Sequence, residues 1–150
     1  MTHHDPKAQP SCVILNAWVQ AAICHGVRDF RAEAIGLLSP TERPVWHRLE
    51  QIETYKEAEI SSSGYTVHTL EAAAWSFLTT ESYEEAVVLA ANLGDDADTV
   101  AAVCGALAGA YYGYSRIPRP WLNQLQDEVR IRKIALALSK QADGTSPNQA

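Results

Sequence analysis

The stretch GDDADTVAAVCGALAGAYYG, from Gly94 to Gly113, constrains the fold of this chain more than any other. Ala101, Gly105, Gly109 and Gly113 recur every four residues, so these positions line one face of a helix. A glycine inside a helix costs about 1 kcal/mol relative to alanine, which favours a central helix that a neighbour approaches closely. The apolar run is too short, and its start too acidic, to span a bilayer. The stretch therefore predicts a buried core helix that holds an acidic turn in place.

Asp96, Asp98 and Thr99 lie at the start of this predicted helix. Two carboxylates in one short turn can converge on the same side, and the threonine hydroxyl can add another oxygen. Clustered oxygen ligands suit a hard cation such as Mg²⁺ or Mn²⁺. Aspartate is also a preferred helix N-cap, and spacing alone favours that simpler function for Asp96 or Asp98. The residues leave both interpretations open, a metal site and a helix cap.

Composition indicates a globular protein. Of 150 residues, 47% are hydrophobic and 20% are charged, which favours neither a disordered chain nor a membrane protein. The net charge of −6 argues against a nucleic-acid backbone as the partner. The chain starts without a basic and then apolar leader, so we expect a cytoplasmic location. Cys12, Cys24 and Cys104 lie among small apolar residues without CxxC spacing, and we expect them to be free and buried.

Hydrophobic periodicity predicts helices along most of the chain. No segment alternates with period two for long, so we expect an all-α fold. The predicted helices cover residues 6–25, unless Pro10 marks a later start, then 29–38 and a segment after Thr41. Further helices carry Val67 to Leu78, run from the cap at Ser82 to near Asn92, and cover the glycine-lined stretch, a short piece from Trp121 and residues 127–138. Asp5 and a capping box of Ser82 and Glu85 mark two helix starts. We expect residues 1–140 to form one domain and residues 141–150 a disordered tail.

A few polar and aromatic side chains stand at predicted helix starts. His3 is a terminal histidine, of a kind that is usually exposed. Gly64 permits a sharp turn, and Tyr65 follows it at a loop–helix junction, where a tyrosine more often packs than stacks on a ligand. His68 and Glu71 follow at helical spacing without an HExxH pattern, so we expect a pair on the helix surface.

Three segments, in this order, resemble the ADP-ribosylglycohydrolase family. They are THHDP at residues 2–6, SGYTVHTLEAAAW at residues 63–75, and GDDADTVAAVCGALAGAYYG followed by IPRPWL. The resemblance implies an all-helical bundle with a binuclear magnesium or manganese centre, which hydrolyses the glycosidic bond between ADP-ribose and a protein side chain or small molecule. Carried over by position, it implies the metal ligands Asp96, Asp98 and Thr99 and the ligand-binding residues His3, Gly64 and Tyr65.

The resemblance covers the C-terminal half of a family member, so we expect a bundle truncated at its N-terminal side. The family's other metal motif, Thr-Asp-Asp, does not occur in this sequence, which supplies only part of the expected ligand shell. Three interpretations follow: an enzyme half that a separate chain or a second copy completes, an ADP-ribose-binding module without activity, or a structural remnant. Each expects an exposed apolar face and hence an oligomer. We expect the isolated chain to be inactive.

Overall fold

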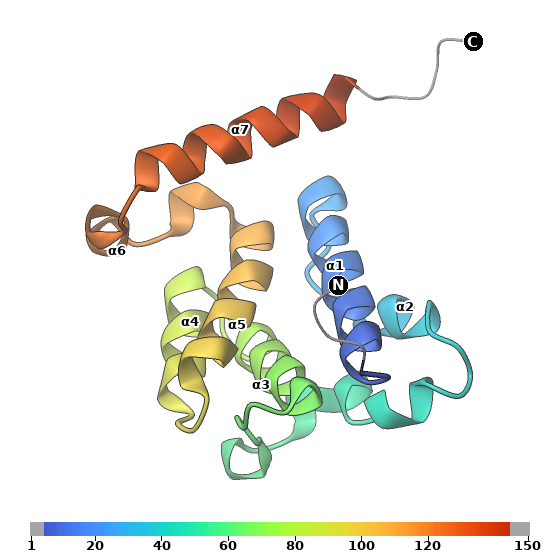
Figure 1. Cartoon of the computed structure of the whole chain (residues 1–150). Helices are drawn as coiled ribbons and strands as arrows, with labels where there is room; N and C mark the ends of the chain where they lie inside the picture. Colours follow the sequence, from blue (N-terminus) through green and yellow to red (C-terminus); the bar gives the residue numbers. More distant parts are fainter. Residues whose placement is uncertain (1–4, 145–150) are drawn as a thin grey trace, which may run out of the picture. The chain divides into compact units, whose positions relative to one another are not determined.

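The computed structural model describes residues 5–144 (Figure 1). Within this range it contains helices and turns but no strand, which confirms the all-α prediction. The chain divides into two compact units, Met1–Arg116 and Ile117–Ala150, where the sequence suggested one domain over 1–140. No helix in the described residues has the length and apolar character needed to cross a membrane.

The first unit is a helical bundle with a stretch of 3₁₀-helices along its chain. Its elements are α1 (Ala8–His25), α2 (Arg31–Gly36), η1 (Arg43–Trp46), η2 (Leu49–Thr54), η3 (Glu57–Glu59), α3 (Thr66–Leu78), α4 (Tyr83–Asn92), α5 (Ala97–Tyr112) and η4 (Tyr114–Arg116). Helix α5 packs against α1, α3 and α4 (Figure 1). It is therefore the central helix that the glycine pattern predicts.

Helix α3 is the most deeply buried element. Every residue from Thr69 to Phe77 is buried, and three alanines in its middle let neighbouring helices approach it from several sides. Phe77 meets Trp18 of α1 edge to face, with the ring centroids 6.1 Å apart. Trp46 and Leu49, from the 3₁₀ stretch, are buried in the same core. The α-helices and the irregular stretch therefore share one hydrophobic core.

Helix α1 follows its predicted end signals closely. The side chain of Asp5 accepts hydrogen bonds from the backbone N–H groups of Lys7 and Ala8, at 2.8 and 3.2 Å, although the helix itself begins at Ala8. Gly26 ends the helix in the left-handed conformation, with φ of 63°. The signals for the start and the end of this helix are local, so they can be identified in the sequence.

The segment after Thr41 differs from its prediction. It forms the 3₁₀-helices η1 and η2 instead of one α-helix. Gln51 has φ of −131°, outside the helical range, so the backbone kinks inside η2. Trp46, Leu49 and Ile52 are buried by this irregular path. In this segment, burial of these large side chains contributes more than a continuous helical backbone would.

The cysteines are free, as predicted, but only one of them is buried. Cys104 of α5 is fully buried, donates its Sγ proton to the carbonyl of Ala86 at 3.4 Å, and has its pKa raised to about 12 by burial. Cys12 and Cys24 are exposed, which corrects the prediction of burial for both. Both lie on the side of α1 that faces away from the core, and apolar neighbours along the chain do not reveal that side.

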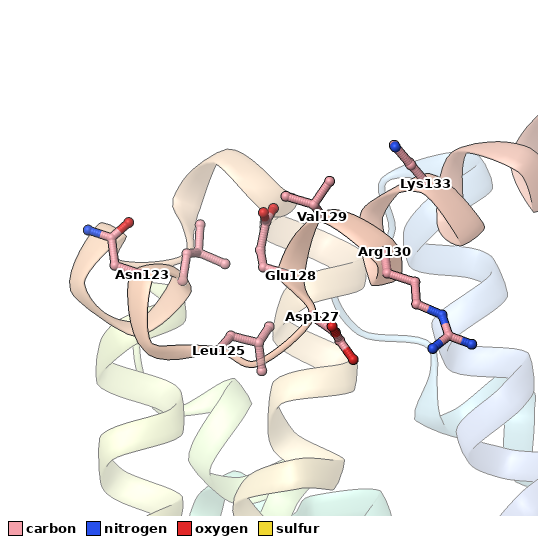
Figure 2. Close-up of a pocket in the computed structure, with 8 residues that line it drawn as sticks. Asn123, Leu125, Asp127, Glu128, Val129, Arg130 and Lys133 are labelled. Carbon is pink, nitrogen blue, oxygen red and sulfur yellow. The ribbon is translucent and has the colours of Figure 1, made fainter.

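The second unit holds α6 (Arg119–Gln124) and α7 (Glu128–Gly144). An open pocket of about 610 Å³ lies where these two helices join (Figure 2). None of the predicted site residues lines it. Helix α7 exposes apolar side chains at Val129, Ile131, Ile134, Leu136 and Leu138. It reaches Gly144, within the predicted tail, and the remainder of that tail lies outside the described residues.

Candidate functional site

Two segments that are far apart in the sequence meet at the N-terminal end of α5. They are the serine-rich loop before α3 and the acidic turn before α5. The N–H of Asp96 donates to the carbonyl of Ser62 at 3.1 Å, and the hydroxyl of Ser62 donates to the carbonyl of Leu93 at 3.3 Å. Ser62 is only 3% exposed. It fixes the acidic turn to the loop, and no signal in the sequence singled it out.

Gly64 lies directly against the carboxylate of Asp96. A Cβ atom at position 64 would stand 2.9 Å from Asp96 Oδ2, which is closer than real Cβ contacts. Only glycine therefore leaves room for the carboxylate in this position. The structure thus brings together Gly64, which the resemblance assigns to ligand binding, and Asp96, which it assigns to a metal.

The side chain of Asp96 is oriented by Thr99. The Thr99 hydroxyl donates to Asp96 Oδ1 at 2.9 Å. Asp96 occupies the N-cap position of α5, but in the described chain its carboxylate forms no capping hydrogen bond to the helix backbone. Its carbonyl accepts from the N–H of Val100 instead. Of the two open interpretations, the geometry does not bear out side-chain capping by Asp96.

His68 and Tyr65 form a second group beside this junction. His68 Nδ1 lies 2.8 Å from the hydroxyl of Ser63, and its ring meets that of Tyr65 edge to face at 4.9 Å. The Lys7 ammonium lies 5.2 Å from the centre of the Tyr65 ring, and a hydrogen bond to Tyr65 raises the pKa of Lys7. Tyr65 remains 38% exposed. Its ring is therefore fixed by neighbours on one side and open to solvent on the other.

Glu71 is buried, which corrects the predicted surface pair with His68. It is 5% exposed, and its Oε2 lies 3.3 Å from Nε of Arg48. Burial raises the pKa of the Glu71 carboxyl, against the opposing effect of the Arg48 charge. Arg48 also donates to the carbonyl of Glu59 at 2.9 Å, and its guanidinium lies 4.2 Å from the centre of the Tyr55 ring. Arg48 and Glu71 thus anchor the segment that leads into the serine-rich loop.

A cavity of about 300 Å³ opens next to the junction, between the first turns of α1, α3 and α5. It is lined by Ser11, Cys12, Leu15, Gly64, Thr66, Thr69, Leu70, Thr99 and Val103. The hydroxyl oxygens of Ser11 and Thr66 are 2.8 Å apart and share a hydrogen bond. The described lining holds hydroxyl and apolar groups but no charged side chain, so it suits an uncharged group.

The donor atoms at the start of α5 fit a hard cation in kind but not in number. Asp96 and Thr99 hold oxygen atoms in contact, and Asp98 lies exposed on the first turn of α5. Among the described residues, however, no group of three or more His, Cys, Asp or Glu side chains is placed to hold a metal ion. The chain presents part of an oxygen shell such as Mg²⁺ prefers. His3, the remaining predicted site residue, lies outside the described residues.

Comparison with known proteins agrees with this arrangement. A family model described as ADP-ribosylglycohydrolase matches residues 1–148. The chain belongs to the ADP-ribosylglycohydrolase family. The resemblance seen in the sequence is thereby confirmed.

Curated relatives align with most of this chain. It is 40% identical over 134 residues to ADP-ribosylarginine hydrolase Tri1 of Serratia proteamaculans, an alignment covering 89% of this chain and 36% of that protein. It is 33% identical over 130 residues to ADP-ribosyl-[dinitrogen reductase] glycohydrolase of Rhodospirillum rubrum, covering 86% of this chain and 41% of that one. The chain therefore spans well under half the length of these relatives.

The fold agrees with a solved structure from the same family. A chain of an ADP-ribosylglycohydrolase-related protein complex matches with a TM-score of 0.79 at 33% sequence identity. The match covers 93% of this chain and 49% of the other. The predicted ADP-ribosylglycohydrolase type of helical bundle is confirmed, and about half of the solved chain has no counterpart here.

Proposed function

We propose that this chain forms part of a metal-dependent ADP-ribosyl hydrolase, in which further residues of the family fold complete the site. The observation that carries the proposal is the fixed Asp96 carboxylate. Thr99 holds one of its oxygens at 2.9 Å, and the other lies where a side chain at Gly64 would collide with it. A carboxylate that a neighbouring hydroxyl orients in this way, with open space beside it at a helix start, is suited to bind a cation.

In this proposal Asp96, Asp98 and Thr99 hold Mg²⁺ or Mn²⁺. A bound ion supplies a Lewis acid that orients ribose hydroxyls and a water molecule. Ser62 keeps the acidic turn in register with the loop, and the exposed ring of Tyr65 offers a surface for a nucleotide or ribose. The named relatives act on ADP-ribosylarginine and ADP-ribosyl-dinitrogen reductase, so an ADP-ribosylated protein is the proposed substrate. The remaining ligands come from the part of the family fold that this chain does not match.

A second candidate function is ADP-ribose binding without hydrolysis. It is favoured by the incomplete donor set, because no three His, Cys, Asp or Glu side chains of the described residues, Asp95 included, are grouped to hold a metal ion. Tyr65 and the adjoining cavity do not depend on a metal for their positions. Such a module would recognise ADP-ribose through these groups alone.

Calorimetric titration of ADP-ribose, with Mg²⁺ and then with EDTA, distinguishes the two functions. We expect binding that requires Mg²⁺ and is lost in Asp96→Asn. Asp95→Asn is the matched control, because it removes a neighbouring charge at an exposed position whose φ of 48° asparagine also tolerates. Binding that EDTA and Asp96→Asn leave unchanged would support the non-catalytic module. Absence of binding in every condition would contradict both functions for this chain.

A further inference from the structure

The outer sides of α1 and α5 carry almost no charge. Charged residues make up 20% of the chain, yet the 18 residues of α1 include no Asp, Glu, Lys or Arg. The 16 residues of α5 include one, Asp98 in the first turn. The exposed side of α1 is formed by Cys12, Val13, Asn16, Gln20, Ile23 and Cys24. We call this surface, together with the exposed Ala102 and Ala106 of α5, the uncharged face.

Other exposed helices of this chain are charged. Helix α4, in the same unit, exposes Glu84 and Glu85, and α7 exposes Arg130 and Lys133. A helix face in contact with water normally carries charged side chains, whereas the central part of a protein interface is depleted of them. Ile23 is 66% exposed on a face without a single charge nearby in its helix. The uncharged face therefore has the composition of a surface that another helix covers.

The uncharged face continues into the candidate site. Helices α1 and α5 pack against each other, and the cavity of about 300 Å³ opens between their first turns. Cys12 and Val103 line this cavity together with Gly64 and Thr99. A helix that covers α1 and α5 therefore reaches the acidic turn as well.

We propose that the uncharged face docks the helices of the ADP-ribosylglycohydrolase fold that this chain does not match. The solved relative carries the matched half together with about as much further chain, since 49% of it is covered here, and that further part is the occupant we assign to this face. The uncharged face has a composition that suits this contact, and it borders the site. The occupant is a helical segment with an apolar side toward α1 and α5. Its supply of further metal ligands to Asp96 rests on the proposed function, whereas the docking does not.

The test uses the full chain and a defined partner. The partner is the part of the Serratia proteamaculans ADP-ribosylarginine hydrolase Tri1 outside the aligned region, produced as a separate chain and used only once circular dichroism shows that it is folded. Sedimentation velocity measures whether the two associate, and N-ethylmaleimide labelling followed by mass spectrometry measures access to each thiol. We expect a complex in which labelling of exposed Cys12 is slowed by about tenfold or more, while buried Cys104 stays unlabelled throughout.

Two valine variants locate the contact. Val13 of α1 is 43% exposed and Val88 of α4 is 42% exposed, so they are matched in residue type, helical context and exposure. We expect Val13→Lys to weaken the complex by about tenfold or more, because a lysine charge would be buried against an apolar partner. Val88→Lys should bind as the unmodified chain does. Circular dichroism and thermal melting establish that both variants fold.

Several outcomes would overturn the docking. Failure of the two parts to associate would do so, as would equal binding by Val13→Lys and Val88→Lys. Protection of Cys12 in the chain alone, together with a dimer in sedimentation, would assign the face to a second copy instead. A complex that forms with the expected protection but hydrolyses no ADP-ribosylated protein contradicts the proposed function and supports the docking.

Discussion

Helix α5 is approached closely at two places, and glycine has a different function at each. At its N-terminal end, Gly64 stands so near Asp96 that a Cβ atom would lie 2.9 Å from the carboxylate. Farther along, Gly105 and Gly109 lie under Tyr83 of α4, where a Cβ atom would be 3.5 Å from Tyr83 Oη and 3.7 Å from Tyr83 Cε2. These are ordinary contact distances. A side chain at position 64 would displace the Asp96 carboxylate, whereas one at position 105 or 109 would displace nothing.

A glycine repeat in a sequence shows which face of a helix is contacted, but it does not show how closely the neighbour approaches. The four-residue spacing of Gly105 and Gly109 identifies the face of α5 that α4 contacts. It does not reveal how near the neighbour comes, because that depends on the side chain opposite. The constraint on Gly64 arises from a residue in another segment, and only the folded chain brings the two together.

The largest effect is expected for Arg48→Met. Arg48 and Glu71 anchor the segment that leads into the serine-rich loop, which contacts the N-terminal end of α5. This change leaves the buried Glu71 carboxylate without its cation and releases the carbonyl of Glu59. Removing one partner of a buried ion pair is strongly destabilising, and with Arg48 partly exposed we expect a loss of about 3 kcal/mol in the free energy of unfolding. Urea denaturation measures it. Arg48→Met/Glu71→Leu should recover most of the loss, and an equally unstable double variant would contradict this explanation.

The middle of α5 is tested by Tyr83→Ala. Tyr83 is half-buried and fills the space above Gly105 and Gly109, so its removal opens a gap between α4 and α5. We expect the free energy of unfolding to fall by about 2 kcal/mol, less than for a fully buried aromatic side chain. Tyr114→Ala, at a tyrosine that is 40% exposed, is the control for loss of an aromatic side chain. Equal losses in both variants would show that the contact with α4 contributes little.

Much of the fold could be predicted because its signals are local. The caps at Asp5 and Ser82 and the periodicity of α3 and α5 involve residues within a few positions of one another. The site residues Gly64, Asp96 and Thr99 came from the family resemblance, and the structure places them together. What the metal and ADP-ribose do there stays a prediction, as does the cytoplasmic location.

The misses share a physical cause, which is contact over long sequence separation. Glu71 looked like half of a surface pair, but it is buried in α3, and its charged partner is Arg48, 23 residues earlier. Ser62 carried no signal in the sequence, because its hydrogen-bond partners lie in the turn before α5. The apolar surroundings of Cys12 suggested burial, but Cys12 is exposed. A helix of uncharged residues does not show in its sequence which side faces the core.

A smaller change in stability, with a specific loss of function, is expected for Gly64→Ala. The added methyl group displaces the carboxylate of Asp96, which is the movable end of a side chain, so unfolding should change by less than about 1 kcal/mol. The displaced oxygen should weaken Mn²⁺ binding by about tenfold, measured by electron paramagnetic resonance titration. Gly36→Ala is the control, because nothing lies within 4 Å of a Cβ atom there. Unchanged Mn²⁺ affinity in Gly64→Ala would remove the main support for a metal at Asp96.

The smallest effect is expected for Gly105→Ala, and its sign is the informative part. A Cβ atom has room at this position, and alanine is favoured over glycine inside a helix by about 1 kcal/mol, so the variant should be slightly more stable than the unmodified chain. Thermal melting and urea denaturation measure the difference. Gly113→Ala, where φ is 82°, should instead be destabilised, because that backbone conformation strains any residue with a Cβ atom. If Gly105→Ala is as unstable as Gly113→Ala, then α4 lies nearer to α5 than ordinary contact distance, and the two glycine contacts of α5 are equivalent.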